Sequence, residues 1–152
     1  MTLHVHYEVC WKNYRAFEDT SWLTIRPLTI LIGSNNSGKT SIISPILLMS
    51  QTISSRDAMT PLVTRGLLAD AGIFKDIIHN HDTSKSLFFG FRYHVHDPQG
   101  KMEEVGAYPP GAAEVTLTAG ERPEDILLSR FALSDIYKRP FLARSMHEGW
   151  RV

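Results

Sequence analysis

The sequence is short of cysteine, of net charge and of long apolar runs. Of its 152 residues, 16 are Lys or Arg and 16 are Asp or Glu, so the formal net charge is zero and no overall positive field attracts nucleic acid. The single cysteine, Cys10, forms neither an internal disulfide nor a thiolate zinc site. No apolar run approaches the roughly 18 residues of a membrane span, and residues 1–6 lack the features of a secretion signal. We therefore expect a cytoplasmic protein that is neither secreted nor membrane-spanning.

What the chain does contain is the composition of an ordinary globular domain. Hydrophobic residues make up 43% of it and charged residues 21%, which supplies enough apolar surface for a core. At roughly 150 residues per domain, the length allows one domain. We expect residues 1–152 to form a single lobe. The lack of a terminating pattern at residue 152 indicates the front part of a longer protein.

Residues 1–53 are expected to form strands, a loop and a helix. Alternating apolar residues predict strands over 3–10 and 22–25, paired antiparallel. An almost continuous apolar run at 28–32 predicts a central strand that is covered on both faces. From residue 39, apolar residues recur at helical spacing, which predicts a helix of about four turns packed on the sheet.

The remainder of the chain divides into two parts. Residues 54–84 lack a regular period and are expected to form an irregular surface excursion with one short helical turn at 74–79. Residues 85–152 are expected to be mainly antiparallel β. The strands predicted there are 86–96, 113–118, 126–133 and 141–146, with the first followed by a hairpin turn at 97–100 and the last two paired.

Residues 33–40, with the sequence GSNNSGKT, match the P-loop pattern G-x-x-x-x-G-K-[ST] between the predicted strand and helix. The glycines let successive backbone N–H groups point at phosphate oxygens, and the helix N-terminus adds partial positive charge. Lys39 would reach the β- and γ-phosphates, and the Thr40 hydroxyl would bind Mg²⁺. The motif predicts ATP and Mg²⁺ as cofactors, with Thr40 as the metal ligand. The nucleotide-binding residues predicted from it are Gly33, Asn35, Asn36, Ser37, Gly38, Lys39, Thr40 and Ser41.

Three segments around this P-loop follow a common pattern: KNYRAF (12–17), LTILIG (28–33) and NNSGKTS (35–41). They resemble the start of ABC-type ATPase heads of the SMC-like, RecF-like and OLD-like group, which follow roughly the pattern N-F-R-x-F … L-T-x-L-I-G-x-N-x-S-G-K-T-S. The later segment GIFKDIIH (72–79) is similar to OLD-like and Septu-type ATPases linked to phage defence. The resemblance covers residues 3–97.

The resemblance implies an α/β P-loop NTPase fold, an ABC-type lobe with a mixed sheet and an antiparallel β part. In such families two heads sandwich ATP. It also implies that Arg15, with Tyr14, lies near the adenine, where a guanidinium or an aromatic ring stacks on the base. A surface arginine and a core tyrosine are the alternative. His79 would lead back toward the nucleotide, with helix capping by Asp76 as the alternative.

Three segments that complete such a head are missing from the sequence: an apolar strand ending in Asp-Glu, a Ser-Gly-Gly signature and a switch histidine. Because no carboxylate is available to position the attacking water, we predict no catalytic residue and no ATP hydrolysis until other segments complete the site. We expect ATP binding within a DNA-related or phage-defence complex. The expected partners are a second copy or the remainder of the ATPase, a nuclease or toxin effector, and DNA.

Two other functions stay open. A structural or regulatory interaction module would keep the P-loop fold without hydrolysis, because a fold does not dictate an activity. A small phosphotransferase is disfavoured by the two predicted strands that precede the strand leading into the P-loop.

Several further residues are weaker candidates. Three His-x-His pairs would each place two rings on one face of a strand, which suits zinc, although solvated histidines are common. The pairs are His4/His6, His79/His81 and His94/His96. Arg56 and Arg65 would contact DNA or simply face solvent. Gln51 lies twelve helical steps from Lys39, roughly 18 Å away, which is too far for it to sense Mg²⁺.

Overall fold

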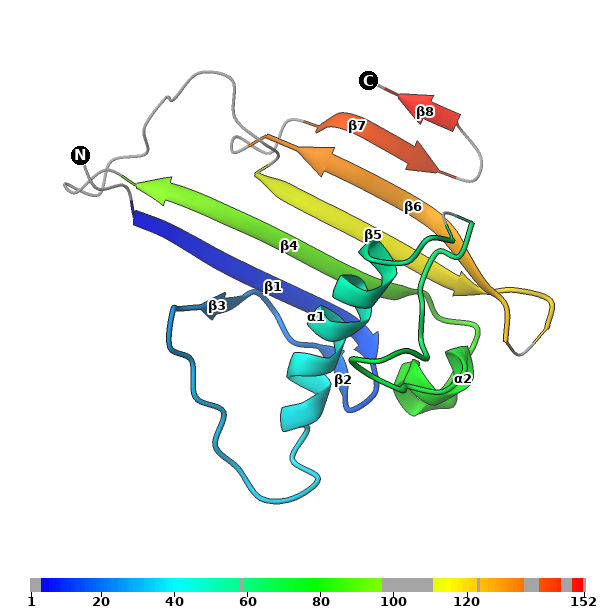
Figure 1. Ribbon diagram of the computed structural model, residues 1–152, viewed down its shortest axis with the longest axis horizontal. Coiled ribbons are helices and arrows are strands. Elements are labelled where there is room, and N and C mark those ends of the chain that lie inside the picture. The colour runs from blue at the N-terminus through cyan, green and yellow to red at the C-terminus, as the bar shows by residue number, and fades with distance from the viewer. Residues whose placement is uncertain are drawn as a thin grey trace.

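The computed structural model describes residues 4–57, 59–96, 111–122, 124–135, 140–145 and 149–151. These residues form an eight-stranded sheet with the order β2-β1-β4-β5-β6-β7-β8, and β3 pairs with β1 beside β2 (Figure 1). Every strand pairing in the described residues is antiparallel, so the expected antiparallel part is found there but the parallel pairs of a mixed sheet are not. The strands are β1 (His4–Tyr14), β2 (Phe17–Asp19), β3 (Leu23–Ile25), β4 (Leu87–His96), β5 (Ala112–Ala119), β6 (Ile126–Ser134), β7 (Pro140–Ser145) and β8 (Gly149–Arg151).

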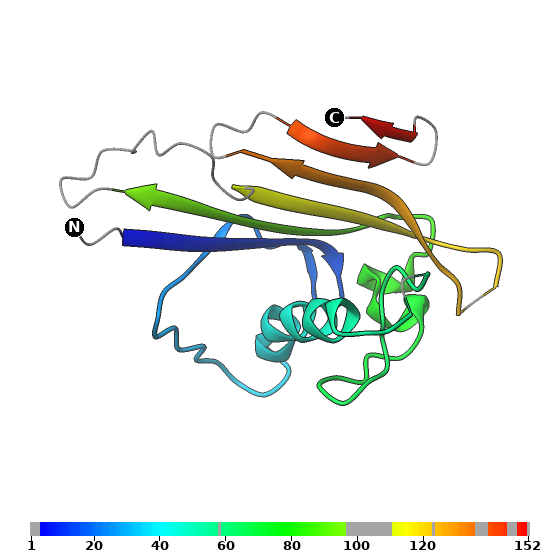
Figure 2. The same cartoon turned by 45° about the horizontal axis from the view of Figure 1, so that its top comes forward.

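The helices lie on one face of this sheet (Figure 2). They are α1 (Lys39–Ile53), α2 (Phe74–Ile77) and the 3₁₀ turn η1 (His79–His81). The predicted helix from residue 39 is confirmed, and it continues without a break through the buried Pro45. The short helical turn predicted at 74–79 is confirmed by α2. Among the described residues, no helix has the length and apolar character needed to cross a membrane.

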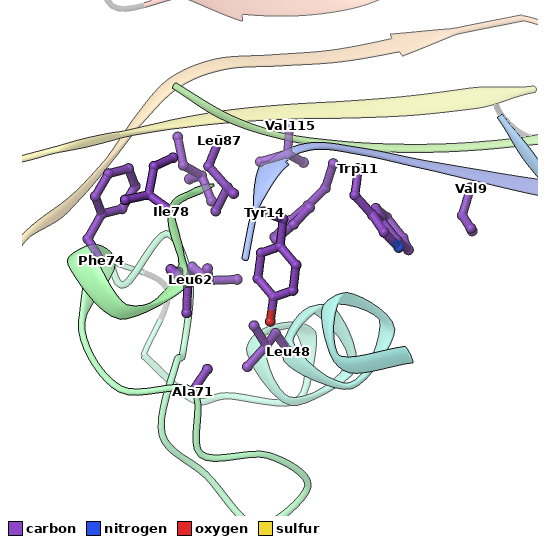
Figure 3. Packing of buried hydrophobic residues seen from close by; sticks show 13 residues of the cluster. Val9, Trp11, Tyr14, Leu48, Leu62, Ala71, Phe74, Ile78, Leu87 and Val115 are labelled. Carbon is purple, nitrogen blue, oxygen red and sulfur yellow. The ribbon is translucent and has the colours of Figure 1, made fainter. Parts of the chain in front are cut away.

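The core lies between the sheet and the helices (Figure 3). Trp11 and Tyr14 of β1 meet Phe89 of β4 edge to face, with ring centroids 5.5 and 5.6 Å apart, and all three are fully buried. Aromatic pairs in this arrangement add to the free energy gained by burial alone. The other members of the cluster are Val9, Leu48, Leu62, Ala71, Phe74, Ile77, Ile78, Leu87, Val115 and Leu117.

Most of the predicted strands are confirmed. Tyr7 pairs with Ile25 and Val9 with Leu23, as expected for antiparallel strands at 3–10 and 22–25. The strands at 86–96, 113–118 and 126–133 correspond to β4, β5 and β6. The predicted partner of the last strand corresponds to β7, which pairs antiparallel with β6. The predicted hairpin turn at 97–100 lies outside the described residues.

The prediction of a buried central strand at 28–32 is wrong. This segment forms neither strand nor helix, and the exposed fractions of Leu28, Ile30 and Ile32 are 78%, 70% and 92%. A strand buried on both faces needs hydrogen-bonding neighbours and covering layers on both sides. The strands described here pair with one another instead, so the segment runs exposed from β3 to α1.

The prediction that residues 54–84 lie on the surface is also wrong in part. Five apolar side chains of this segment are buried in the core cluster: Leu62, Ala71, Phe74, Ile77 and Ile78. Their spacing follows no helical or strand period, which is why the sequence pattern did not reveal their burial. The segment therefore helps to hold the sheet and α1 together.

Candidate functional site

The P-loop curls through two residues in the left-handed region. The backbone φ is 64° at Asn36 and 89° at Gly38. A side chain at Gly38 would be strained at that φ, and its Cβ would lie 2.9 Å from the ring of Phe17. Glycine is therefore required at residue 38, and β2 packs directly against the P-loop.

The start of α1 offers backbone donors to an anion. Its N-cap is Gly38, which has no side chain to cap the helix, and the first turn contains no acidic residue. The first N–H groups of a helix have no acceptor within the helix and carry part of its positive charge. The backbone of Lys39, Thr40 and Ser41 is thus available to phosphate oxygens, with no carboxylate in this turn to compete.

The side chain of Lys39 lies over the P-loop. Its Nζ donates hydrogen bonds to the carbonyl oxygens of Gly33, at 2.7 Å, and Ser34, at 2.5 Å. The N–H of Ser37 also donates to Ser34 O, at 3.3 Å. A phosphate oxygen carries more negative charge than these neutral carbonyls and forms a stronger bond with an ammonium group. The donor set fits a polyphosphate, to which Lys39 can transfer its bonds.

Arg15 and the P-loop share one open cleft of about 500 Å³. That volume is within the usual range for small-molecule sites. Thr40 is exposed in this cleft, so its hydroxyl is accessible to a metal ion, whereas Ser41 is largely buried. Of the predicted binding residues, only Gly33 and Ser37 are outside the cleft wall. The lining residues are Arg15, Ala16, Asn35, Asn36, Gly38, Lys39, Thr40 and Ser41.

Strand β1 holds α1 in place through two side chains. The indole N–H of Trp11 donates to the carbonyl oxygen of Ile42 at 3.0 Å, and the Tyr14 hydroxyl lies 2.8 Å from Ser44 Oγ. Burial raises the pKa of Tyr14 above its ordinary value. Tyr14 is therefore a core residue, and of the two residues predicted near the base only Arg15 lies at the cleft.

The backbone of Arg15 is held by the segment that contains α2. Arg15 has a φ of 47°, its N–H donates to Ile77 O at 2.8 Å, and its carbonyl oxygen lies 2.7 Å from His79 Nδ1. Its guanidinium donates to Ala71 O at 3.3 Å and lies 5.7 Å from the Tyr14 ring centroid. Sequence reasoning did not identify Ala71 or Phe17 as supports of the site, although Phe17 belongs to the quoted segment KNYRAF.

Gln51 is a structural residue. Its amide nitrogen donates to Val63 O at 2.6 Å and to Ala69 O at 3.2 Å, and its amide oxygen accepts from the Ala69 N–H at 3.1 Å. These contacts fix the loop 63–69 against the last turns of α1. Arg65 pairs with Asp70 at 3.7 Å across an exposed turn, and Arg56 is exposed.

The histidine pairs do not form a metal centre in the described residues. His79 and His81 bond two different backbone carbonyls, those of Arg15 and Lys75, each at 2.7 Å. His94 bonds the carboxylate of Glu8. The side chains of His4 and His96 lie outside the described part of the chain. Where side chains are described, no group of three or more His, Cys, Asp or Glu residues is arranged to hold a metal ion.

Comparison with known families agrees with this geometry. The model of the AAA ATPase domain matches residues 8–136, a range that runs from within β1 to just beyond β6 and includes the P-loop, α1 and α2. No curated protein matches the chain. ATPases of this kind generally use ATP and Mg²⁺, which suits the donors and the exposed threonine of the cleft. The chain belongs to the AAA ATPase domain family and has an α/β fold of the P-loop type.

Proposed function

We propose that this chain binds Mg-ATP in the cleft between the P-loop and Arg15. The observation that carries the proposal is the convergence of three features in one cleft: the start of α1, which has no side-chain cap, and the cationic residues Lys39 and Arg15. All three favour a ligand with several negative charges. The family match supports the same conclusion.

Each group in the cleft has a definite task in binding. The backbone N–H groups at the start of α1 donate to phosphate oxygens, and Lys39 transfers its hydrogen bonds from the Gly33 and Ser34 carbonyls to the β- and γ-phosphates. Thr40 supplies a hydroxyl ligand for Mg²⁺, which neutralises phosphate charge when bound. Arg15 stacks on the base or pairs with a phosphate.

ATP hydrolysis, on this proposal, needs groups beyond those in the sequence. A carboxylate that positions water and a signature segment that closes on the γ-phosphate would come from another segment or from a second head. This follows from the resemblance to the SMC-like, RecF-like and OLD-like group, with Septu-type defence ATPases among its members. Within such an assembly, DNA and a nuclease or toxin effector are the proposed partners.

The apolar surface of the lobe favours such an assembly. The segment 28–32 is exposed, and a groove of about 610 Å³ beside α1 is lined mostly by apolar side chains, among them Met49, Ile53 and Phe131. Exposed apolar surface of this kind is typical of contacts between proteins. Association with a second copy or with the remainder of the ATPase is therefore part of the proposal.

Titration calorimetry with ATP, ADP and AMP, each with and without Mg²⁺, tests the proposal. Because the contacts are made mainly to phosphates, we expect affinity to fall in the order ATP, ADP, AMP, and Mg²⁺ to strengthen ATP binding. Equal affinity for all three nucleotides would overturn the assignment. Phosphate release above background that is lost in Lys39→Ala would contradict the need for further segments. Absence of nucleotide binding would favour the interaction module.

A further inference from the structure

The geometry points to His79 as a positioning residue for the nucleotide cleft. Its ring holds the backbone of Arg15 in the conformation in which Arg15 lines the cleft together with the P-loop. This role rests on the proposed function, because it concerns how Arg15 meets the bound nucleotide. It adds a residue that does not itself line the cleft.

The contact between the two residues has a defined direction. A carbonyl oxygen only accepts hydrogen bonds, so His79 Nδ1, 2.7 Å from Arg15 O, must carry the proton. The neutral ring is therefore the Nδ1–H tautomer. Arg15 needs this support because its φ of 47° is a conformation that residues other than glycine seldom adopt. The Arg15 N–H is bonded to Ile77 O on the same segment, so both polar backbone groups of Arg15 are bonded there.

The ring of His79 is itself fixed by its neighbours. Ile77 and Ile78, immediately before it, are fully buried, and Ile78 forms a β-bridge with Tyr14. Asp76 Oδ2 accepts a hydrogen bond from the Ile73 N–H at 2.9 Å, which caps α2. Capping by Asp76 and the bond from His79 to Arg15 therefore both occur, and together they fix the segment beneath the β1–β2 turn.

The same turn meets the P-loop directly. A Cβ at Gly38 would lie 2.9 Å from the Phe17 ring and 3.5 Å from the Ala16 Cβ, so the residues after Arg15 pack on the glycine that immediately precedes α1. The Ala71 carbonyl accepts from the guanidinium at 3.3 Å and orients it. A displacement of the Arg15 backbone would therefore move the guanidinium relative to the phosphate donors, which stay fixed on α1.

Two variants of His79 separate the hydrogen bond from the packing. His79→Phe keeps a ring of similar size and removes the donor, whereas His79→Asn places an amide N–H at the position of Nδ1. We expect His79→Phe to weaken Mg-ATP binding three- to tenfold in calorimetry, and His79→Asn to stay within twofold of the parent chain. His81→Phe is the matched control, since the His81 ring bonds Lys75 O away from the cleft, and it should leave the affinity unchanged.

The effect of His79→Phe on Mg-ATP affinity, measured again in a chain that also carries Arg15→Ala, shows whether His79 acts through Arg15. If it does, His79→Phe causes no further loss of affinity once the guanidinium is gone. A loss of equal size in both backgrounds, an unchanged affinity of His79→Phe, or a failure of His79→Asn to restore binding would each overturn the role. If Lys39→Ala and Arg15→Ala weaken ATP binding while His79→Phe does not, only this inference fails. If Lys39→Ala and Arg15→Ala both leave ATP binding unchanged, the proposed function fails as well.

Discussion

The hydroxyl of Tyr14 lies 2.8 Å from the hydroxyl of Ser44, and both side chains are buried between β1 and α1. Ser44 stands in the second turn of the helix whose first residue is Lys39. Buried hydroxyls need a partner within the protein, because water does not reach them. This pair, together with the bond from Trp11 to Ile42, sets where the P-loop helix lies on the sheet.

Replacing Tyr14 by Phe leaves the Ser44 hydroxyl buried without its partner. We expect the free energy of unfolding to fall by about 1–2 kcal/mol, the usual cost of such a loss. The double variant Tyr14→Phe/Ser44→Ala removes both polar groups and should be less destabilised than the sum of the two single variants. Urea unfolding of the four proteins measures this coupling. Strictly additive losses would show that the two hydroxyls do not interact.

Replacing Gly38 by Ala tests the geometry of the P-loop. Because φ is 89° and the new Cβ would approach the Phe17 ring, we expect a loss of about 1–3 kcal/mol in the free energy of unfolding, together with weaker nucleotide binding. Adding Phe17→Ala relieves the clash but not the backbone strain. Full recovery of ATP affinity in that double variant would argue against a requirement for glycine conformation.

Gln51 should matter for stability and not for magnesium. Gln51→Met keeps the length of the side chain and removes its three hydrogen bonds to Val63 and Ala69, so the loop 63–69 loses its attachment. We expect faster hydrogen exchange at the Ala69 amide and a lower free energy of unfolding by about 1–3 kcal/mol. The Mg²⁺ dependence of ATP binding should be that of the parent chain. A selective loss of that dependence would identify Gln51 as a metal sensor.

Glu8 makes the free energy of unfolding depend on pH in the acid range. Burial alone would raise the pKa of Glu8, but the hydrogen bonds and charges of Arg92 and His94 outweigh it and hold the pKa below its ordinary value. The Glu8 contribution to stability is therefore complete above the ordinary glutamate pKa of about 4.3 and is lost as the pH falls through the lowered value. Glu8→Gln should show a shallower loss of stability in this range.

Urea unfolding at several pH values between neutrality and acid follows that loss. Glu121→Gln is the control, because Glu121 is exposed in the turn between β5 and β6. The control should follow the parent chain at every pH. If Glu8→Gln lost stability in acid as steeply as the parent, the acid response would have to arise from other carboxylates.

Regular spacing explains which elements the sequence predicts. The alternation in β1 and β4 and the helical spacing in α1 are local patterns, so the existence of these elements follows from the sequence. The buried face of α1 does not follow from it, because Ile43, Ile46 and Ile53 of the apolar repeat are exposed. The helix instead buries Ser41, Ser44, Pro45, Leu48 and Gln51. The apolar run 28–32 has the composition of a buried strand, yet its burial depends on neighbouring strands, which a local pattern does not specify. For the same reason the buried residues of 54–84, which follow no period, could not be recognised.

The two walls of the cleft, the P-loop and the segment with Arg15, also differ in how far they can be predicted from the sequence. The P-loop wall is predicted by its motif, because the spacing of glycine, lysine and threonine reflects the geometry of phosphate binding. The position of Arg15 on the opposite wall depends on a hydrogen bond from His79 Nδ1 to the Arg15 carbonyl oxygen, between residues 64 apart in the chain. No periodicity encodes such a contact, and the positive φ of Arg15 on which it depends is not evident from the residue type.

The affinity of Mg-ATP for Lys39→Ala, measured by calorimetry beside the parent chain and Lys75→Ala, tests the central claim most directly. Lys75 is exposed on α2, and its replacement removes the same charge away from the cleft. Loss of a charge-assisted phosphate contact is worth about 1.5–3 kcal/mol, so Lys39→Ala should bind roughly tenfold to a hundredfold more weakly while Lys75→Ala binds as the parent. Equal affinity in all three proteins would contradict ATP binding at the P-loop.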